Sequence, residues 1–124
     1  MREIEYKGKR KDTNEWVYGY FWKAFGEHFF IKSLTKDKKS YADFEIKPET
    51  LGQFTGLYDK KHNKIYEGDI VVLNDDAYEL FTIKWDEKTA AFIFESEDLS
   101  YSFDNYSGHD LEVIGNIHDN PNII

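Results

Sequence analysis

Cysteine is absent from this 124-residue sequence, methionine occurs once and proline twice. Without cysteine the chain forms no disulfide framework, no thiolate metal site and no cysteine nucleophile. No apolar run approaches the ~18 residues that a membrane helix needs, and the N-terminus lacks the apolar segment of a secretory signal. These absences predict a soluble protein with no membrane partner, and the lack of cysteine fits a reducing cytoplasm.

The acidic charge of the chain lies mainly in its second part. The formal net charge is −8, but residues 1–48 contain 11 Lys and Arg against 8 Asp and Glu, a balance of +3, whereas residues 49–124 contain 5 against 16, a balance of −11. A surface this acidic repels phosphate backbones. We therefore disfavour nucleic-acid binding for that part and prefer a solvated acidic surface to a cation site. The opposite signs also allow docking of the two parts, within one chain or in a homo-oligomer.

Most of the chain alternates apolar and polar residues with the period of a β-strand. No window keeps the i, i+3, i+4, i+7 stripe of a helix, and β-branched and aromatic residues dominate the alternating segments. We expect strands over residues 15–22, 28–34, 41–47, 53–55, 70–73, 79–85, 90–96, 99–103 and 111–117. Polar turns separate them, so the sequence predicts a mainly β protein of antiparallel strands with little helix.

The segment 15–22 carries apolar side chains on both faces of its expected strand. One face holds Trp16, Tyr18, Tyr20 and Trp22, and the other holds Val17, Gly19 and Phe21. Strands buried on both sides have this composition. We therefore expect a central strand that is covered on two sides.

Three of the eight glycines lie within residues 51–73, at Gly52, Gly56 and Gly68. A phosphate-binding loop would need a helix directly after its glycines, but the run that follows is β-branched. Turns are the better interpretation: we expect a short strand over 53–55 with a bulge or tight bend at each end, at Gly52 and Gly56. We also expect a polar turn over 59–64 and a tight turn at Gly68 with Asp69 as its cap. A glycine and an aspartate that lead into a strand are typical of small SH3-like barrels.

Two motifs resemble one protein family. The segment QFTGLYDKKHNKIYEGDIV (53–71) and the closing EVIGNIHDNPNII (112–124) are similar to the signatures of the YopX-like family of bacteriophage and prophage proteins. The family usually has glycine where this chain has His62, a residue that tolerates a positive φ comparatively well. The resemblance spans the chain and implies a mainly β protein with an SH3-like roll and no established activity. We expect an N-terminal antiparallel β subdomain over 1–50 and an SH3-like β roll over 51–124, packed as one compact unit.

Catalytic chemistry has little support in the sequence. Glu67 and Asp69 could do acid–base work or hold Mg²⁺, but we prefer a turn in which they bind backbone N–H groups. The four histidines show no metal-ligand spacing, and no nucleophile motif is present. We expect no enzyme activity, no cofactor and no metal.

Binding is the remaining class, and aromatic residues near turns are its candidates. We expect binding residues at Tyr58, Tyr66, Glu67, Asp69 and Trp85, with Tyr101 as a further rim residue. The function that we predict is a non-catalytic binding or accessory module that acts on a protein partner of unknown identity. The alternative is a nucleic-acid-associated factor that uses this rim and the basic stretch of Lys7, Lys9, Arg10 and Lys11.

Overall fold

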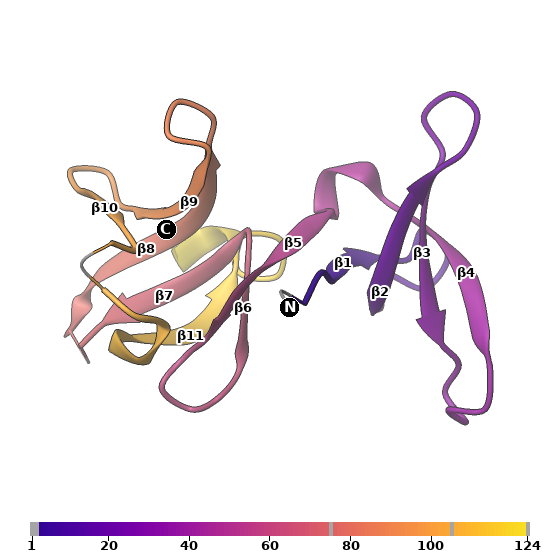
Figure 1. Cartoon of the computed structure of the whole chain (residues 1–124), viewed down its shortest axis with the longest axis horizontal. Helices are drawn as coiled ribbons and strands as arrows, with labels where there is room; N and C mark the ends of the chain where they lie inside the picture. Colours follow the sequence, from indigo (N-terminus) through magenta and orange to yellow (C-terminus); the bar gives the residue numbers. More distant parts are fainter. Residues whose placement is uncertain (1–2, 75, 105, 124) are drawn as a thin grey trace. The chain divides into compact units, whose positions relative to one another are not determined.

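The computed structural model describes residues 3–74, 76–104 and 106–123, which form strands β1 to β11 and three short 3-10 turns (Figure 1). The chain divides into two compact units, Met1–Phe54 and Thr55–Ile124. The sequence predicts this division four residues earlier, after Thr50, and it also predicts close packing of the two parts, which stays a prediction. Within the described residues, no helix is both long and apolar enough to cross a membrane.

The first unit is an antiparallel meander. Its strands are β1 (Tyr6–Lys9), β2 (Trp16–Lys23), β3 (Phe29–Leu34) and β4 (Tyr41–Ile46). Strand β2 pairs with β1 up to Gly19 and with β3 from Tyr20 onward, so it changes partner in its middle. This change of partner lies between Gly19 and Tyr20.

Strand β4 returns to the end of β1. The Lys47 N–H donates to the Lys9 carbonyl at 2.8 Å, and the Lys11 N–H donates to the Glu45 carbonyl at 3.0 Å. The curled sheet encloses a small core in which Ile31 and Ile46 are fully buried. The first unit therefore has a core of its own.

Strand β5 (Gly52–Tyr58) follows the 3-10 turn η1 (Pro48–Thr50). Its first two residues pair with Tyr6 and Lys7 of β1, and its later residues belong to the second unit, where β6 (Lys64–Tyr66) is its neighbour in the sheet. A strand limited to residues 53–55 is thus a wrong prediction, because β5 continues through Gly56 to Tyr58.

The second unit contains a five-stranded antiparallel sheet. Its order is β10 (Ser100–Ser102), β9 (Ala91–Glu95), β8 (Asp76–Asp86), β7 (Asp69–Leu73) and β11 (Leu111–Asn116). The 3-10 turns η2 (Gly108–Asp110) and η3 (Pro121–Ile123) flank β11. Its buried core is apolar and consists of Ile65, Val71, Phe81, Ile83, Phe94 and Leu111.

The mainly antiparallel β fold is confirmed, whereas the SH3-like character of the second unit stays a prediction. Sequence reasoning did not include β1 among the expected strands, because two of its four residues are lysines and a third is glycine. It was also wrong about β2. That strand is covered on one side only, because Tyr18, Tyr20 and Trp22 are exposed.

Candidate functional site

Two of the predicted binding residues are buried. Tyr66 is 5% exposed and Asp69 is 3% exposed. The Tyr66 N–H donates to the Asp69 carboxylate at 2.8 Å, as a buried turn requires for its backbone donors. These two residues therefore serve the turn between β6 and β7, and their expected role as surface contacts is corrected.

The other predicted binding residues lie on separate elements. Tyr58, at the end of β5, stacks on His62 with a ring distance of 4.8 Å, and Glu67 is partly buried in the β6–β7 turn. Trp85, on β8, is 44% exposed and its ring lies 5.1 Å from Phe92. The structure thus does not bring Tyr58, Glu67 and Trp85 together on one element.

The signature aspartate at position 59 organises the second unit, a role that sequence reasoning missed. Asp59 is fully buried. One carboxylate oxygen accepts the backbone N–H groups of Lys61 at 3.0 Å and Asn63 at 2.8 Å, and the other accepts the Val113 N–H at 2.9 Å. Burial alone would raise the pKa of Asp59, but these donors outweigh it and hold the pKa below its ordinary value.

This aspartate also satisfies an edge of the sheet. Strand β11 is the last strand of its sheet, and an open strand edge is a template for unwanted pairing. In addition to the Asp59 bond at Val113, the Lys60 N–H donates to the Leu111 carbonyl at 2.9 Å. The turn over 59–63 thereby occupies backbone groups along the edge of β11.

The three glycines of the segment 51–73 have different backbone conformations. Gly56 has φ +90° and Gly68 has φ +92°, both in the left-handed region that favours glycine. His62 also has a positive φ, +67°. Gly52 is different: it is buried at the start of β5 and pairs with Lys7, so its expected bend is not observed.

The closing motif is a network of hydrogen bonds around β11. The Asn116 side-chain oxygen accepts the N–H groups of His118 at 3.0 Å and Asp119 at 2.9 Å, and the Asn120 side-chain oxygen accepts the Asn116 N–H at 3.2 Å. A Cβ at Gly115 would lie 2.5 Å from that Asn120 oxygen. This motif therefore builds the chain reversal after β11.

A metal site has no counterpart in the part of the chain that the structure describes. No three His, Asp or Glu side chains there are grouped so that they could hold an ion. Asp59 and Asp69 hold backbone N–H groups, which leaves less capacity for proton transfer or for a cation.

The N-terminal basic stretch is not the solvated patch that the nucleic-acid alternative requires. Lys7 is only 6% exposed. Its ammonium lies 4.6 Å from the centre of the Trp16 ring, and that of Lys9 lies 5.4 Å from it. Arg10 pairs with Asp12 at 2.7 Å and Lys11 pairs with Glu45 at 2.9 Å.

The outer face of β2 exposes the aromatic side chains of Tyr18, Tyr20 and Trp22. Tyr20 is 63% exposed, and Tyr41, on β4, is 60% exposed. The β2–β3 and β3–β4 registers place Tyr20 opposite Lys32, and Leu34 opposite Tyr41. The aromatic rings thus share this face with Lys32 of β3, which is also exposed.

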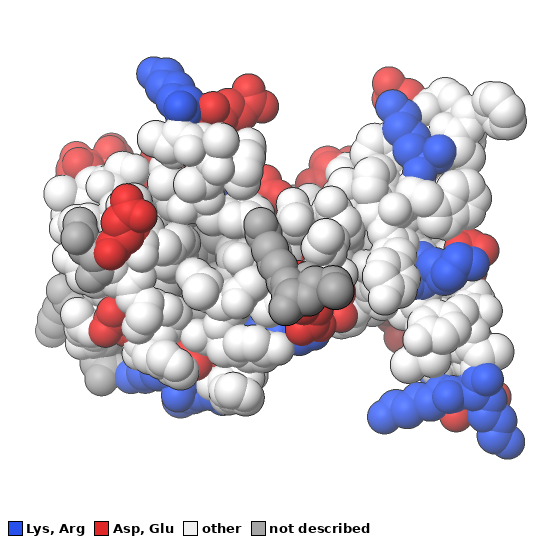
Figure 2. All heavy atoms as spheres, viewed as in Figure 1, with Lys and Arg blue, Asp and Glu red and all other residues white. Residues whose placement is uncertain are grey.

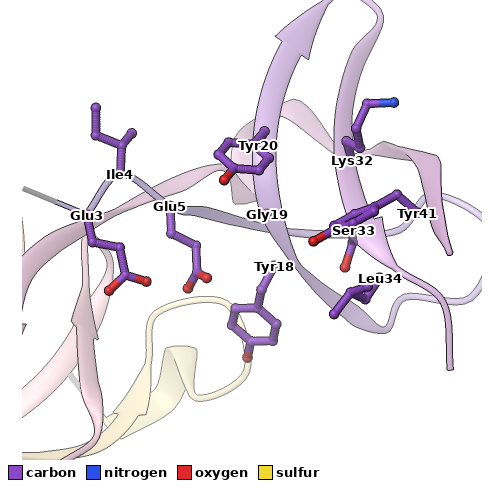
Figure 3. Close-up of a pocket in the computed structure, with 10 residues that line it drawn as sticks. All are labelled: Glu3, Ile4, Glu5, Tyr18, Gly19, Tyr20, Lys32, Ser33, Leu34 and Tyr41. Atoms are coloured by element: carbon purple, nitrogen blue, oxygen red, sulfur yellow. The ribbon is translucent and has the colours of Figure 1, made fainter. Parts of the chain in front are cut away.

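A pocket of about 380 Å³ opens on this face (Figure 3). The side chains of Tyr18, Tyr20, Leu34 and Tyr41 line this pocket, which we call the tyrosine pocket. Gly19 lies between Tyr18 and Tyr20, at the point where the pairing partner of β2 changes from β1 to β3. A Cβ at Gly19 would collide with the Lys32 carbonyl. Glycine at this position therefore allows the close approach of β2 and β3 beneath the pocket.

The size and the mixed lining of the tyrosine pocket suit a large apolar side chain together with the polar backbone on either side of it. Its volume lies at the lower end of the range for ligand pockets, roughly 300–1,000 Å³. Tyrosine supplies an apolar ring and a polar hydroxyl with few rotatable bonds, which is why it is frequent at protein interfaces. This pocket is the candidate functional site.

Comparison with known proteins identifies a family and a fold. A model of the family described as "YopX protein" matches residues 5–124. The solved structure of protein EF1440 from Enterococcus faecalis is similar over 99% of each chain, with 23% sequence identity and a TM-score of 0.60. No curated protein matches the chain. At this identity the structural likeness concerns the fold alone.

Proposed function

We propose that this chain, which belongs to the YopX family, is a non-catalytic binding module that takes up part of a protein partner in the tyrosine pocket. The observation that carries the proposal is the exposed outer face of β2, with Tyr20 63% and Tyr41 60% exposed around a pocket of about 380 Å³. Exposed apolar patches rimmed by polar residues mark interaction sites.

The uses of the signature carboxylates support a non-catalytic role. Asp59 accepts backbone N–H groups from two different segments, and Asp69 accepts one within its own turn. Carboxylates held in this way stabilise the fold. The tyrosine pocket, in contrast, is lined by Tyr20 and Tyr41, whose side chains are mostly exposed.

The two motifs also support a finer assignment. Their similarity to bacteriophage and prophage proteins favours a phage or prophage origin and action in the host cytoplasm. A genome neighbourhood of phage genes is the expected result. A neighbourhood of ordinary chromosomal genes, without any phage gene, would contradict this origin.

A variant-matched capture experiment tests the proposed function. The whole chain is immobilised and exposed to an extract of the cells that encode it, in three forms: unmodified, Tyr20→Ser with Tyr41→Ser, and Phe25→Ser. Phe25 is the matched control, because it is an aromatic residue of the same unit that is 97% exposed and does not line the pocket. We expect a protein that the unmodified chain and the control retain and that the double variant loses.

The captured protein is then purified and titrated against the three forms. Loss of two side chains from the centre of an interface is expected to weaken binding by about 30-fold or more. Equal retention and equal affinity in all three forms would place the binding surface elsewhere. Circular dichroism spectra of the three forms check that the double variant remains folded.

A further inference from the structure

The tyrosine pocket has carboxylates on one side. Glu3 and Glu5 line it from the segment that leads into β1. Figure 3 shows both on the side opposite Leu34 and Tyr41, with the rings of Tyr18 and Tyr20 between the two sides. This side of the pocket therefore contains two acidic residues.

The other side of the pocket continues into a basic turn. Leu34 ends β3 and Tyr41 begins β4, so the turn over 35–40 starts at the pocket wall. It carries three exposed lysines, Lys36, Lys38 and Lys39. Lys36 lies 3.7 Å from Glu15, but its side chain is still 88% exposed. Figure 2 shows Lys and Arg side chains gathered at the end of the first unit where this turn lies.

The one acidic side chain of that turn is held by the turn itself. The carboxylate of Asp37 accepts the Thr35 hydroxyl at 2.5 Å and the Lys39 N–H at 3.0 Å. These bonds, the Thr35 bond first, lower the pKa of Asp37. Three ammonium groups and one carboxylate give the turn a formal charge of +2 (3 − 1 = +2).

The acidic residues on one side of the pocket and the lysines on the other suit a ligand that carries its negative charge at one end. We propose that the occupant of the tyrosine pocket is a protein segment with a large apolar anchor residue and acidic residues on one side of that anchor only. The anchor fills the pocket, and the acidic side lies along the turn over 35–40. The inference rests on the proposed function and names the chemistry of the partner for the same pocket.

A nucleic acid fits this surface less well. Aromatic rings and lysines together are a common surface for single strands, but a strand carries a negative phosphate at every nucleotide. A continuous strand across the pocket would bring phosphates against Glu3 and Glu5. A protein segment avoids this repulsion because its charges can be confined to one side of the anchor.

Synthetic peptides test the inference. Three labelled peptides share a central Leu-Phe anchor and carry, on one side of it, either Glu-Asp-Glu, Lys-Arg-Lys or Ser-Gly-Ser; each is made in both chain orientations. Binding to the whole chain is measured by fluorescence anisotropy. We expect the acidic peptide, in one orientation, to bind about tenfold more tightly than the neutral one and the basic peptide to bind most weakly. Raising NaCl from about 0.05 M to about 0.3 M should reduce the difference.

Two sets of variants locate the effect. The substitutions Lys36→Ser, Lys38→Ser and Lys39→Ser should remove the preference for the acidic peptide while the neutral peptide binds as before. The substitutions Lys61→Ser, Lys84→Ser and Lys88→Ser, at three exposed lysines of the second unit, should leave the preference unchanged. Tyr20→Ser with Tyr41→Ser should weaken all peptides equally.

The remaining outcomes overturn the inference. Equal or tighter binding of the basic peptide, or no peptide binding, would reject the acidic partner, and the capture experiment would still decide whether the pocket binds a protein. Tighter binding of a labelled oligothymidine than of any peptide, lost in the three-lysine variant, would assign the surface to nucleic acid. Self-association of the chain is measured by analytical ultracentrifugation. If the chain self-associates and the self-associated form no longer binds peptide, the pocket would be assigned to a second copy of this chain.

Discussion

The signature segments of the second unit and the outer face of the first unit use their distinctive residues in opposite ways. In the second unit, Asp59 and Asp69 are buried and their carboxylates accept backbone N–H groups. In the first unit, Tyr20 and Tyr41 are exposed around a pocket. The difference teaches that a strongly patterned motif can specify a chain path, while the surface available for binding lies in a less distinctive segment.

The comparison has a consequence for mutations. Residues that fix the chain path should change stability strongly and binding only through unfolding. Residues of the tyrosine pocket should do the reverse, since side chains exposed on a sheet contribute little to the folded state. Measured free energies of unfolding and binding therefore test this contrast.

The largest expected effect is that of Asp59→Ala. The substitution leaves the N–H groups of Lys61, Asn63 and Val113, which make partly buried hydrogen bonds, without their acceptor. We expect a loss of about 3 kcal/mol in the free energy of unfolding, because three donors are affected and each costs about 1 kcal/mol, the lower end of the range for an unsatisfied buried donor. Urea denaturation followed by tryptophan fluorescence measures it.

The control for this prediction is Asp98→Ala, an exposed aspartate in the same unit. It should cost less than about 0.5 kcal/mol. Similar costs for the two substitutions would show that Asp59 does not hold the turn and β11 together.

The same carboxylate predicts a dependence on pH. The backbone donors hold the folded pKa of Asp59 below its ordinary value of 3.8, against the opposing effect of burial. A carboxyl with a depressed pKa stabilises the fold at pH values above its unfolded pKa, and this contribution is lost as pH falls through the folded pKa. The difference in unfolding free energy between the unmodified chain and Asp59→Asn should therefore shrink below about pH 4. A difference that stays constant between neutral and acidic pH would contradict the depressed pKa.

A smaller loss is expected for Gly68→Val. Gly68 has φ +92°, a conformation that a β-branched residue rarely adopts. A Cβ at this position would make ordinary van der Waals contact, 3.8 Å from the Ile117 side chain, so the cost that we expect is that of backbone strain. We expect more than about 1 kcal/mol.

Gly68→Asn is the matched variant, because asparagine tolerates a positive φ better than valine. It should lose clearly less stability than Gly68→Val in the same urea titration. Equal stability of both variants and the unmodified chain would show that the turn does not need a glycine-like conformation.

Most of the fold could be predicted from the sequence, because alternation of period two depends on local pattern alone. The strands over 70–73 and 111–117 were predicted within a residue or so of β7 and β11. The exposure of β2 could not be read from its own residues, since both of its faces are apolar. The neighbouring strands indicate the exposure of this face. Lys32 on β3 and Asp43 on β4 lie opposite each other on it, and such side chains are seldom buried.

The candidate site was harder to predict, for a related reason. The Asp59 carboxylate accepts the N–H of Val113, a residue 54 positions away. No local sequence pattern predicts this hydrogen bond. The tyrosine pocket depends on the change of partner at Gly19, which is decided by sheet topology. Closeness to a turn predicts a binding residue at Tyr66, but this residue is buried, with 5% of its surface exposed.

The smallest change in stability is expected for Tyr20→Ser with Tyr41→Ser. Both side chains are mostly exposed, so their removal should alter the free energy of unfolding by about 1 kcal/mol or less. The control is Phe21→Ser, since Phe21 lies between Tyr20 and Trp22 on the opposite face of β2, where its ring packs 5.2 Å from that of Phe29. This change should cost about 3 kcal/mol. A double variant as unstable as Phe21→Ser would mean that the tyrosines hold the first unit together, and the contrast between a structural second unit and a binding surface on β2 would be lost.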